Sequence, residues 1–208
     1  MALALTIVLV FVLLGFNELW WRKHPMHSEF SRKFIHVTVG SFVAFWPYFL
    51  SWHEIQFLSV AFLVGIAASK YLNVYQAIHS VQRPTWGEVL FAIAVGVTTL
   101  ITHDKAIYAA ALLQMSLADG MAAVIGTHYG NRQKYLVFGH TKSILGTLTF
   151  FFISLLILIG FSHYSHAHLS PIVIGIIAAT ASMIENLAIH GLDNLLVPMV
   201  VALLLVHS

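Results

Sequence analysis

Long apolar runs separated by short polar segments make up most of the chain. Several runs approach the roughly 20 residues that an α-helix needs to cross a bilayer. Backbone exposed to lipid must form its hydrogen bonds internally, so such runs predict helices. We expect eight helices, with seven as the alternative because the last run is short for a crossing. Their predicted ranges are 2–21, 33–51, 55–71, 87–102, 106–126, 144–161, 170–190 and 194–207.

The composition supports an integral membrane protein. Of the 208 residues, 59% are hydrophobic and 9% charged, and the mean hydropathy is +0.87, whereas soluble domains carry about 25% charged residues. We therefore expect an all-α polytopic bundle forming a single domain over residues 1–208. The net charge of +2 says little about partners, and the absence of cysteine excludes disulfides and thiolate chemistry. The first run has no basic segment before it, so we expect a retained helix rather than a signal peptide.

The Lys and Arg residues predict the orientation. Of the ten in the chain, only Lys105 falls outside one alternate set of loops. Cytoplasmic loops are enriched in Lys and Arg, so the basic set should face the cytosol and the N-terminus should lie outside. Most acids and amides of interest fall on the same side. A nucleic-acid partner is not expected.

Asp119 is the strongest single candidate for function. It lies in an apolar run, where a carboxylate is costly and usually faces a cavity or a partner. Gly120 and Gly126 follow it, and Gly130 begins the next loop. These glycines could let a phosphate approach the backbone. The alternatives are a structural pair between Asp119 and a buried cation, and close helix packing at the glycines.

The loop after this run carries cations. Arg132, Lys134 and Lys142 could bind phosphate oxygens, and Lys142 and Ser143 come where the next helix is expected to begin. A helix N-terminus favours anions. The alternative is an ordinary cytosolic loop, and the spacing does not match a Walker A loop.

Two earlier segments hold further candidates. In "SRKFIHVTVG", Arg32 and Lys33 lie about one helical turn before His36, which could be functional or a core histidine. In "RPTWGE", Arg83 and Glu88 flank a turn. Its simpler interpretation is a capping box, with Thr85 as N-cap and Glu88 three positions later.

The last candidates surround the turn before the final run. Glu185 lies in an apolar run, and Asp193 and Asn194 follow eight and nine residues later. Carboxylate and amide oxygens suit a hard cation such as Mg²⁺. Asp-Asn before an apolar run is also typical of a helix N-cap.

Five segments in this order resemble the CTP-dependent lipid-alcohol kinases, which include dolichol, phytol and farnesol kinases and CTP-dependent diacylglycerol kinases. The resemblance runs from about Arg32 to Pro198, and it depends on the ordered combination rather than on any single segment. The segments are "RKFIH", "RPTWGE", "ADGMAAVIGTHYG", "KSILGT" and "ENLAIHGLDNLLVP".

The third segment departs from the family pattern. Ala123 stands where a second acid is usual, and Thr127 and His128 stand where an Arg is usual. Glu185 or Asp193 could supply the missing carboxylate, and Arg132 could supply the missing cation.

The resemblance implies CTP as phosphoryl donor, Mg²⁺ as cofactor and a membrane isoprenoid alcohol such as a polyprenol, dolichol or phytol as acceptor. It implies an active site on the cytosolic face, in a plasma membrane or in the endoplasmic reticulum or another organelle. Asp119 would be the first metal ligand, assisted by Asp193, Glu185 and Asn194. Lys33, Arg83 and Lys142 would neutralise phosphates, and His36 or Glu88 would be the general base. The rivals are a diacylglycerol kinase, a lipid cytidylyltransferase and, more distantly, a lipid transporter.

Overall fold

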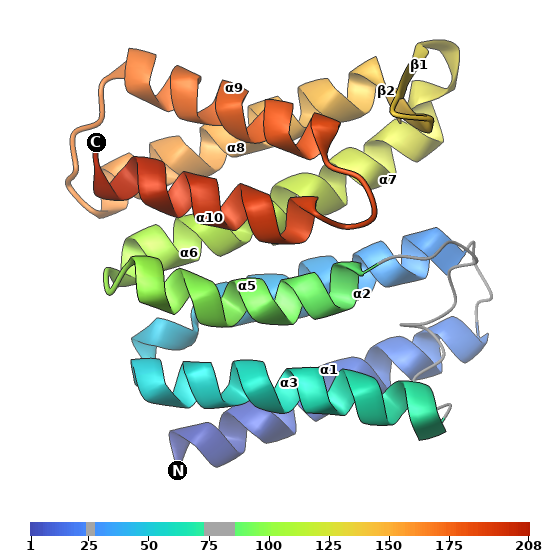
Figure 1. Ribbon diagram of the computed structural model, residues 1–208, viewed down its shortest axis with the longest axis vertical. Helices are drawn as coiled ribbons and strands as arrows, with labels where there is room; N and C mark the ends of the chain where they lie inside the picture. Colours follow the sequence, from blue (N-terminus) through green and yellow to red (C-terminus); the bar gives the residue numbers. More distant parts are fainter. Residues whose placement is uncertain (24–27, 73–85) are drawn as a thin grey trace.

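The computed structural model describes residues 1–23, 28–72 and 86–208 and confirms an all-α architecture. Every predicted apolar run that it describes is helical over most of its length. Figure 1 shows the helices lying side by side in a layered bundle, with the N- and C-termini at the same end. The helices are α1 (Ala2–Lys23), α2 (Ser28–Ala44), α3 (Trp52–Leu72), α5 (Gly87–Ile101), α6 (Lys105–Leu113), α7 (Asp119–Tyr129), α8 (Ile144–Tyr164), α9 (Pro171–Leu187) and α10 (Asp193–Val206).

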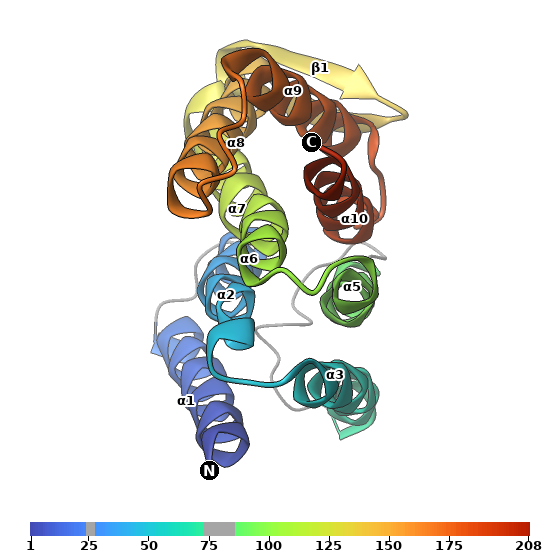
Figure 2. The same cartoon turned by 90° about the vertical axis from the view of Figure 1, so that its left-hand side faces the viewer.

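The bundle has two hydrophobic cores joined through α6. One lies among α6, α7, α8, α9 and α10, and includes Phe150, Leu158 and Val201. The other lies among α1, α2, α3, α5 and α6, and includes Val43 and Trp46. Viewed along the helices, α1 and α3 lie at one end of the stack, and α8 and α9 at the other (Figure 2).

The apolar helices are those of a membrane protein. Three described helices are long and apolar enough to cross a bilayer: Ala2–Trp20, Lys105–Tyr129 and Ile144–Tyr164. Four shorter apolar helices accompany them: Trp52–Ala68, Gly87–Ile101, Pro171–Leu187 and Asp193–Val206. The number of crossings and the orientation of the N-terminus stay predictions.

The helix predicted at 106–126 is longer and contains a π-helical turn. α6 and α7 are joined by Gln114–Ala118 into one helix that ends at Tyr129. π-helical turns are rare and frequently mark functional sites. This turn comes immediately before Asp119, the candidate with the strongest sequence signal.

Two local expectations were wrong, and one local feature was not predicted. The helix predicted at 33–51 ends at Ala44 and gives way to a short 3₁₀ helix, Trp46–Tyr48, around Pro47, which cannot continue a helix. The loop after α7 contains an antiparallel hairpin, β1 (Lys134–Val137) and β2 (His140–Ser143). The predicted helix start was also wrong, because Trp86 is the N-cap of α5 and Glu88 is only the second residue of the helix; Thr85, the predicted N-cap, lies outside the described residues.

Candidate active site

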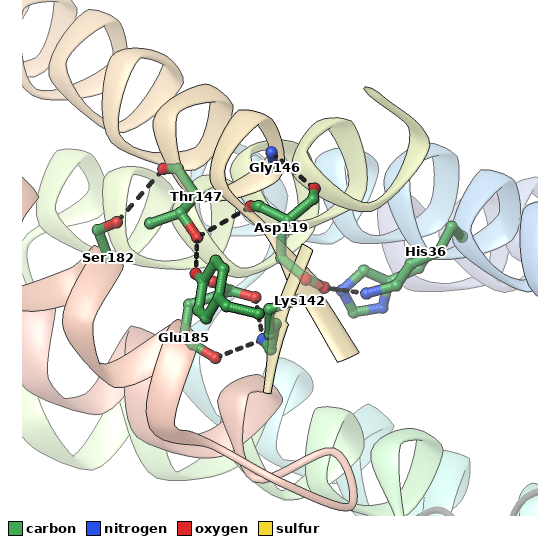
Figure 3. Close-up of polar contacts among 10 residues, drawn as sticks. His36, Asp119, Lys142, Gly146, Thr147, Ser182 and Glu185 are labelled. Atoms are coloured by element: carbon green, nitrogen blue, oxygen red, sulfur yellow. Dashed lines mark hydrogen bonds and ion pairs between the residues drawn. The ribbon is translucent and has the colours of Figure 1, made fainter. Parts of the chain in front are cut away.

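Two lysine–carboxylate pairs form the polar centre of one end of the bundle. Lys33 Nζ on α2 donates to Asp119 Oδ2 on α7 at 2.5 Å. Lys142 Nζ on β2 donates to Glu185 Oε1 on α9 at 2.5 Å. Lys33, Lys142 and Glu185 interact electrostatically with the neighbouring pair or with Asp193, so the two pairs belong to one charged cluster. Figure 3 shows Asp119, Lys142 and Glu185 in this cluster.

Asp119 is placed by the contact between α2 and α7. Its residue is only 3% exposed, and a buried carboxylate is tolerated where it is paired and hydrogen-bonded. A Cβ at Gly120 would lie 2.1 Å from Val37 Cγ2, so only glycine allows α2 to approach α7 this closely. This close approach brings Lys33 to Asp119, as the structural-pair alternative expected.

His36 lies beside the same carboxylate. Its Nε2 is 3.8 Å from Asp119 Oδ2 and 3.0 Å from the carbonyl oxygen of Met115 in the π-helical turn. A carbonyl oxygen only accepts hydrogen bonds, so Nε2 carries the proton and donates it to Met115. If His36 acts as a base, the lone pair must therefore be on Nδ1 of the neutral ring.

The second pair is built on the hairpin. Lys142 Nζ also donates to the backbone carbonyl of Glu185 at 2.8 Å, which fixes β2 against the end of α9. Burial alone would lower the pKa of Lys142, but the neighbouring Glu185 carboxylate more than offsets this and raises the pKa above its usual value. Lys142 is therefore positively charged at physiological pH.

Ser143 and the glycines hold the hairpin to the helices. Ser143 is the N-cap of α8, accepts from the Gly146 N–H at 3.1 Å and donates to the Gly126 carbonyl at 3.3 Å. An added Cβ at Gly126 or Gly130 would lie 2.8 or 2.5 Å from Ser143 Oγ. Packing thus accounts for both glycines, and their contact with a phosphate stays a prediction. Arg132 and Lys134 are exposed at the outer part of this segment.

The start of α5 is attached to the turn between α9 and α10. The Trp86 N–H donates to the His190 carbonyl at 3.0 Å, and Asn194 Nδ2 donates to the Gly87 carbonyl at 2.9 Å. These hydrogen bonds join the segments "RPTWGE" and "ENLAIHGLDNLLVP", and Glu88 lies next to the point where they meet. Arg83 and the side chain of Arg32 lie outside the described residues.

A polar chain that the sequence did not predict borders the second pair. The Tyr135 hydroxyl lies 2.5 Å from Thr147 Oγ1, and Ser182 Oγ donates to the Thr147 carbonyl at 3.5 Å. These contacts link β1, α8 and α9, and Thr147 and Ser182 are labelled in Figure 3. Thr147 is the last residue of the segment "KSILGT", and its place in that segment is the sequence feature that could have identified it as part of the site.

The carboxylate oxygens of the site are of the ligand type that Mg²⁺ prefers. Within the described ranges, no three His, Asp or Glu side chains converge as a ready-made metal site, so Asp119, Glu185 and Asp193 do not form a three-ligand set. Mg²⁺ is usually held by one or two carboxylates together with substrate phosphates. Asp119 is a single buried carboxylate of the kind that this mode uses.

The fold and this site define an all-α membrane protein with a charged centre at one end of the bundle. Comparison with known proteins identifies its relatives more closely. The chain is 32% identical over 185 residues to a phytol kinase from a Synechocystis species, in a match covering 85% of this chain and 78% of that protein. It is 25% identical over 219 residues to probable phytol kinase 2, chloroplastic, from Oryza sativa subsp. japonica, covering 94% and 71%. No family model and no solved structure matches.

The extent and identity of the first match are sufficient to assign a family. The chain belongs to the phytol kinase family, a family of lipid-alcohol kinases.

Proposed function

We propose that the protein transfers the γ-phosphoryl group of CTP to the hydroxyl of a membrane isoprenoid alcohol, such as phytol or a related polyprenol, with Mg²⁺ as cofactor. The proposal rests chiefly on the two lysine–carboxylate pairs, gathered at one end of a lipid-embedded bundle in a chain of this family. Phosphoryl transfer depends mainly on positioning and charge neutralisation. Two ammonium groups and a buried carboxylate provide both.

The pairs would exchange partners when the nucleotide binds. In the described state each buried charge is neutralised by its neighbour, which avoids the cost of an unpaired buried ion. Lys33 and Lys142 would turn to phosphate oxygens, and Asp119 would turn to the metal. Mg²⁺, when bound, would neutralise charge on the β- and γ-phosphates. The site would then keep its balance of charge throughout binding.

The reaction itself needs an acceptor hydroxyl and a route for its proton. The alcohol oxygen forms a bond to the γ-phosphorus, and the bond from that phosphorus to the β–γ bridging oxygen breaks, leaving CDP. The hydroxyl proton passes to a base, either His36 through Nδ1 or the Glu88 carboxylate. Both residues line the same cleft as Lys33.

The donor and the acceptor class are tested together. Purified protein is incubated with Mg²⁺, one of four γ-labelled ribonucleoside triphosphates, and phytol, farnesol, a polyprenol or diacylglycerol. We expect labelled lipid with CTP and an isoprenoid alcohol. Labelling of diacylglycerol alone would favour the diacylglycerol kinase alternative. No labelled lipid under any condition would contradict the proposal.

A further inference from the structure

An apolar cleft extends from the charged centre into the bundle. Its polar part is lined by Lys33, His36, Glu88 and Asn194, from α2, α5 and α10. Lys33 is the partner of Asp119, so the cleft is continuous with the candidate active site. The rest of its lining comes from apolar side chains on α1, α2, α3 and α5.

The depth of each lining residue follows from the helices. Val39 lies about one turn beyond His36 on α2, Phe91 about one turn beyond Glu88 on α5, and Phe62 about one turn beyond Ile66 on α3. α2 and α5 run away from the charged end, whereas α3 runs toward it (Figure 1). Phe62 and Phe91 therefore form the deep end of the cleft.

A second, narrower space lies directly beyond these two phenylalanines. Phe62 and Phe91 line it too, together with Val43 on α2, Trp46 in the 3₁₀ helix after α2, and Leu58 on α3, all of which lie further from the charged end. It is too tight for a water molecule. The two rings thus separate the open cleft from a space that continues in the same direction.

We propose that this cleft holds the apolar chain of the acceptor alcohol, and that Phe62 and Phe91 limit the chain length. This inference rests on the proposed function. The ligand is an amphiphile with one hydroxyl and a long hydrocarbon tail. The hydroxyl lies among Lys33, His36 and Glu88, and the tail runs toward the two rings.

The lining supports an amphiphile rather than a second nucleotide. Charged and amide groups occupy one part of the cleft, while Val39, Phe62, Ile66 and Phe91 provide only hydrocarbon. Burial of apolar surface stabilises the tail, and a hydroxyl beside a possible base becomes the reacting group. Phe91 also packs edge-on against the His36 ring, with centroids 5.3 Å apart, and so links the deep wall to the polar part.

A second apolar cleft provides an internal comparison. It lies between α6 and α8 near the opposite end, and Phe45, Leu113, Ile157, Phe161 and Tyr164 are among the residues that line it. None of its described lining residues is charged. It offers a tail-binding surface without a group that could act on a hydroxyl, and it supplies matched control positions.

The first test enlarges and fills the cleft. Phe62→Ala should raise the ratio of kcat/KM for a long polyprenol to that for farnesol by about tenfold or more, since even one methylene changes selectivity by about that factor. Ile66→Trp should reduce the use of every long-chain alcohol while leaving the KM for the nucleotide unchanged. Phe161→Ala and Ile157→Trp, in the other cleft, should leave the chain-length ratio as in the wild type.

Two outcomes would overturn the inference. One is a uniform change in kcat/KM for all alcohols in both Phe62→Ala and Ile66→Trp. The other is an equal shift of the chain-length ratio in the control variants. Ile66 is only partly buried, so its variant keeps the test decisive if Phe62→Ala fails to fold.

The second test needs no turnover and separates this inference from the proposed function. An isoprenoid alcohol with a photoactivatable group at its tail end is cross-linked to the full chain, with and without excess phytol. We expect competed cross-links on α2, α3 and α5 around Phe62 and Phe91. Cross-links on α6 and α8 instead would overturn the cleft assignment. Correct cross-links without phosphorylation of any alcohol would leave the cleft standing and overturn the proposed kinase reaction.

Discussion

The two ends of the bundle use the same kinds of residue in different ways. At the end opposite the candidate site, Asp104 caps α6 by accepting from the backbone N–H groups of Ala106 and Ile107 at 2.7 and 2.9 Å. Glu54 likewise accepts from the backbone and side chain of Ser51, both at 2.8 Å. These acids serve the start of their own helix, as capping residues do.

At the site end, the acids are held by lysines from other elements. Asp119 is paired across α2 and α7, and Glu185 across β2 and α9. The side chains of these two acids are 4% and 9% exposed. A local cap needs neither deep burial nor a lysine from another element. The burial of Asp119 and Glu185 and their pairing with distant lysines therefore indicate that these acids do more than start a helix. The opposite end therefore provides control positions for variants at the site end.

Labelling of introduced cysteines should show which end of the bundle faces the outside of the cell, and it should differ completely between the two ends. The chain has no native cysteine, so single cysteines can report on each end: one at Arg132, between α7 and β1 at the site end, and one at His166, between α8 and α9 at the opposite end. We expect an impermeant thiol reagent applied to intact cells to label the cysteine at His166 and to spare the one at Arg132. The opposite labelling pattern would reverse the predicted orientation.

Asp119→Asn should cause the largest loss of activity. The substitution keeps the size of the side chain and removes the charge that would hold Mg²⁺, so kcat/KM should fall at least about a hundredfold, the upper range for changes next to a metal ligand. Glu54→Gln, the same type of change at the other end, should leave activity near the wild-type value. Near-normal turnover of Asp119→Asn at limiting Mg²⁺ would make Asp119 a structural residue.

Lys142→Ala should affect the nucleotide more than the lipid. Loss of one charge-assisted hydrogen bond costs about 1.5–3 kcal/mol, so kcat/KM for CTP should fall by about ten- to a hundredfold. Lys105→Ala, at the opposite end, is the matched control. The raised pKa of Lys142 keeps its charge until the pH rises through that raised value, so no loss of nucleotide use from this group is expected between pH 6 and about 9.

A charge swap distinguishes a phosphate-binding lysine from a purely structural pair. Lys142→Glu combined with Glu185→Lys retains opposite charges but moves the cation to α9. A structural pair would tolerate the exchange and recover activity relative to Lys142→Glu alone. We expect folding to be recovered in the double variant while nucleotide use is not.

Gly126→Ala should produce the smallest effect, on stability. Its new methyl group would lie 2.8 Å from Ser143 Oγ and 3.1 Å from the backbone Cα of Gly146, and overpacking of this kind costs about 1–3 kcal/mol. Gly175→Ala has nothing within 4 Å of the new atom and should be neutral or slightly stabilising. Thermal unfolding in detergent measures the stability of both variants. Equal melting temperatures for Gly126→Ala and Gly175→Ala would show that close packing does not require glycine at position 126.

The sequence predicted the features that depend on a single segment of the chain. Apolar runs of helical length predicted the helices, and isolated polar residues within them, such as Asp119 and Glu185, predicted the candidate site. The family resemblance added the order of the segments. None of these signals requires knowledge of which helices are neighbours.

The sequence did not predict which segments pair with one another. Lys33 and Lys142 were assigned to phosphates, but their partners in the described state are acids 86 and 43 residues away along the chain. The hairpin was missed because Phe138 and Gly139 both adopt positive φ in its turn, and phenylalanine rarely does so. The π-helical turn before Asp119 likewise has no recognised sequence signal here.

The most direct test follows both ends of one nucleotide. CTP labelled differently on the γ-phosphate and on cytidine is incubated with Mg²⁺, an isoprenoid alcohol and either the wild type, Asp119→Asn or Glu54→Gln. We expect the γ-label alone on the lipid and the cytidine label in CDP for the wild type and Glu54→Gln, and neither product for Asp119→Asn. Cytidine label on a lipid with γ-label in pyrophosphate would establish a cytidylyltransferase, and CTP left intact by the wild type with every alcohol would contradict phosphoryl transfer altogether.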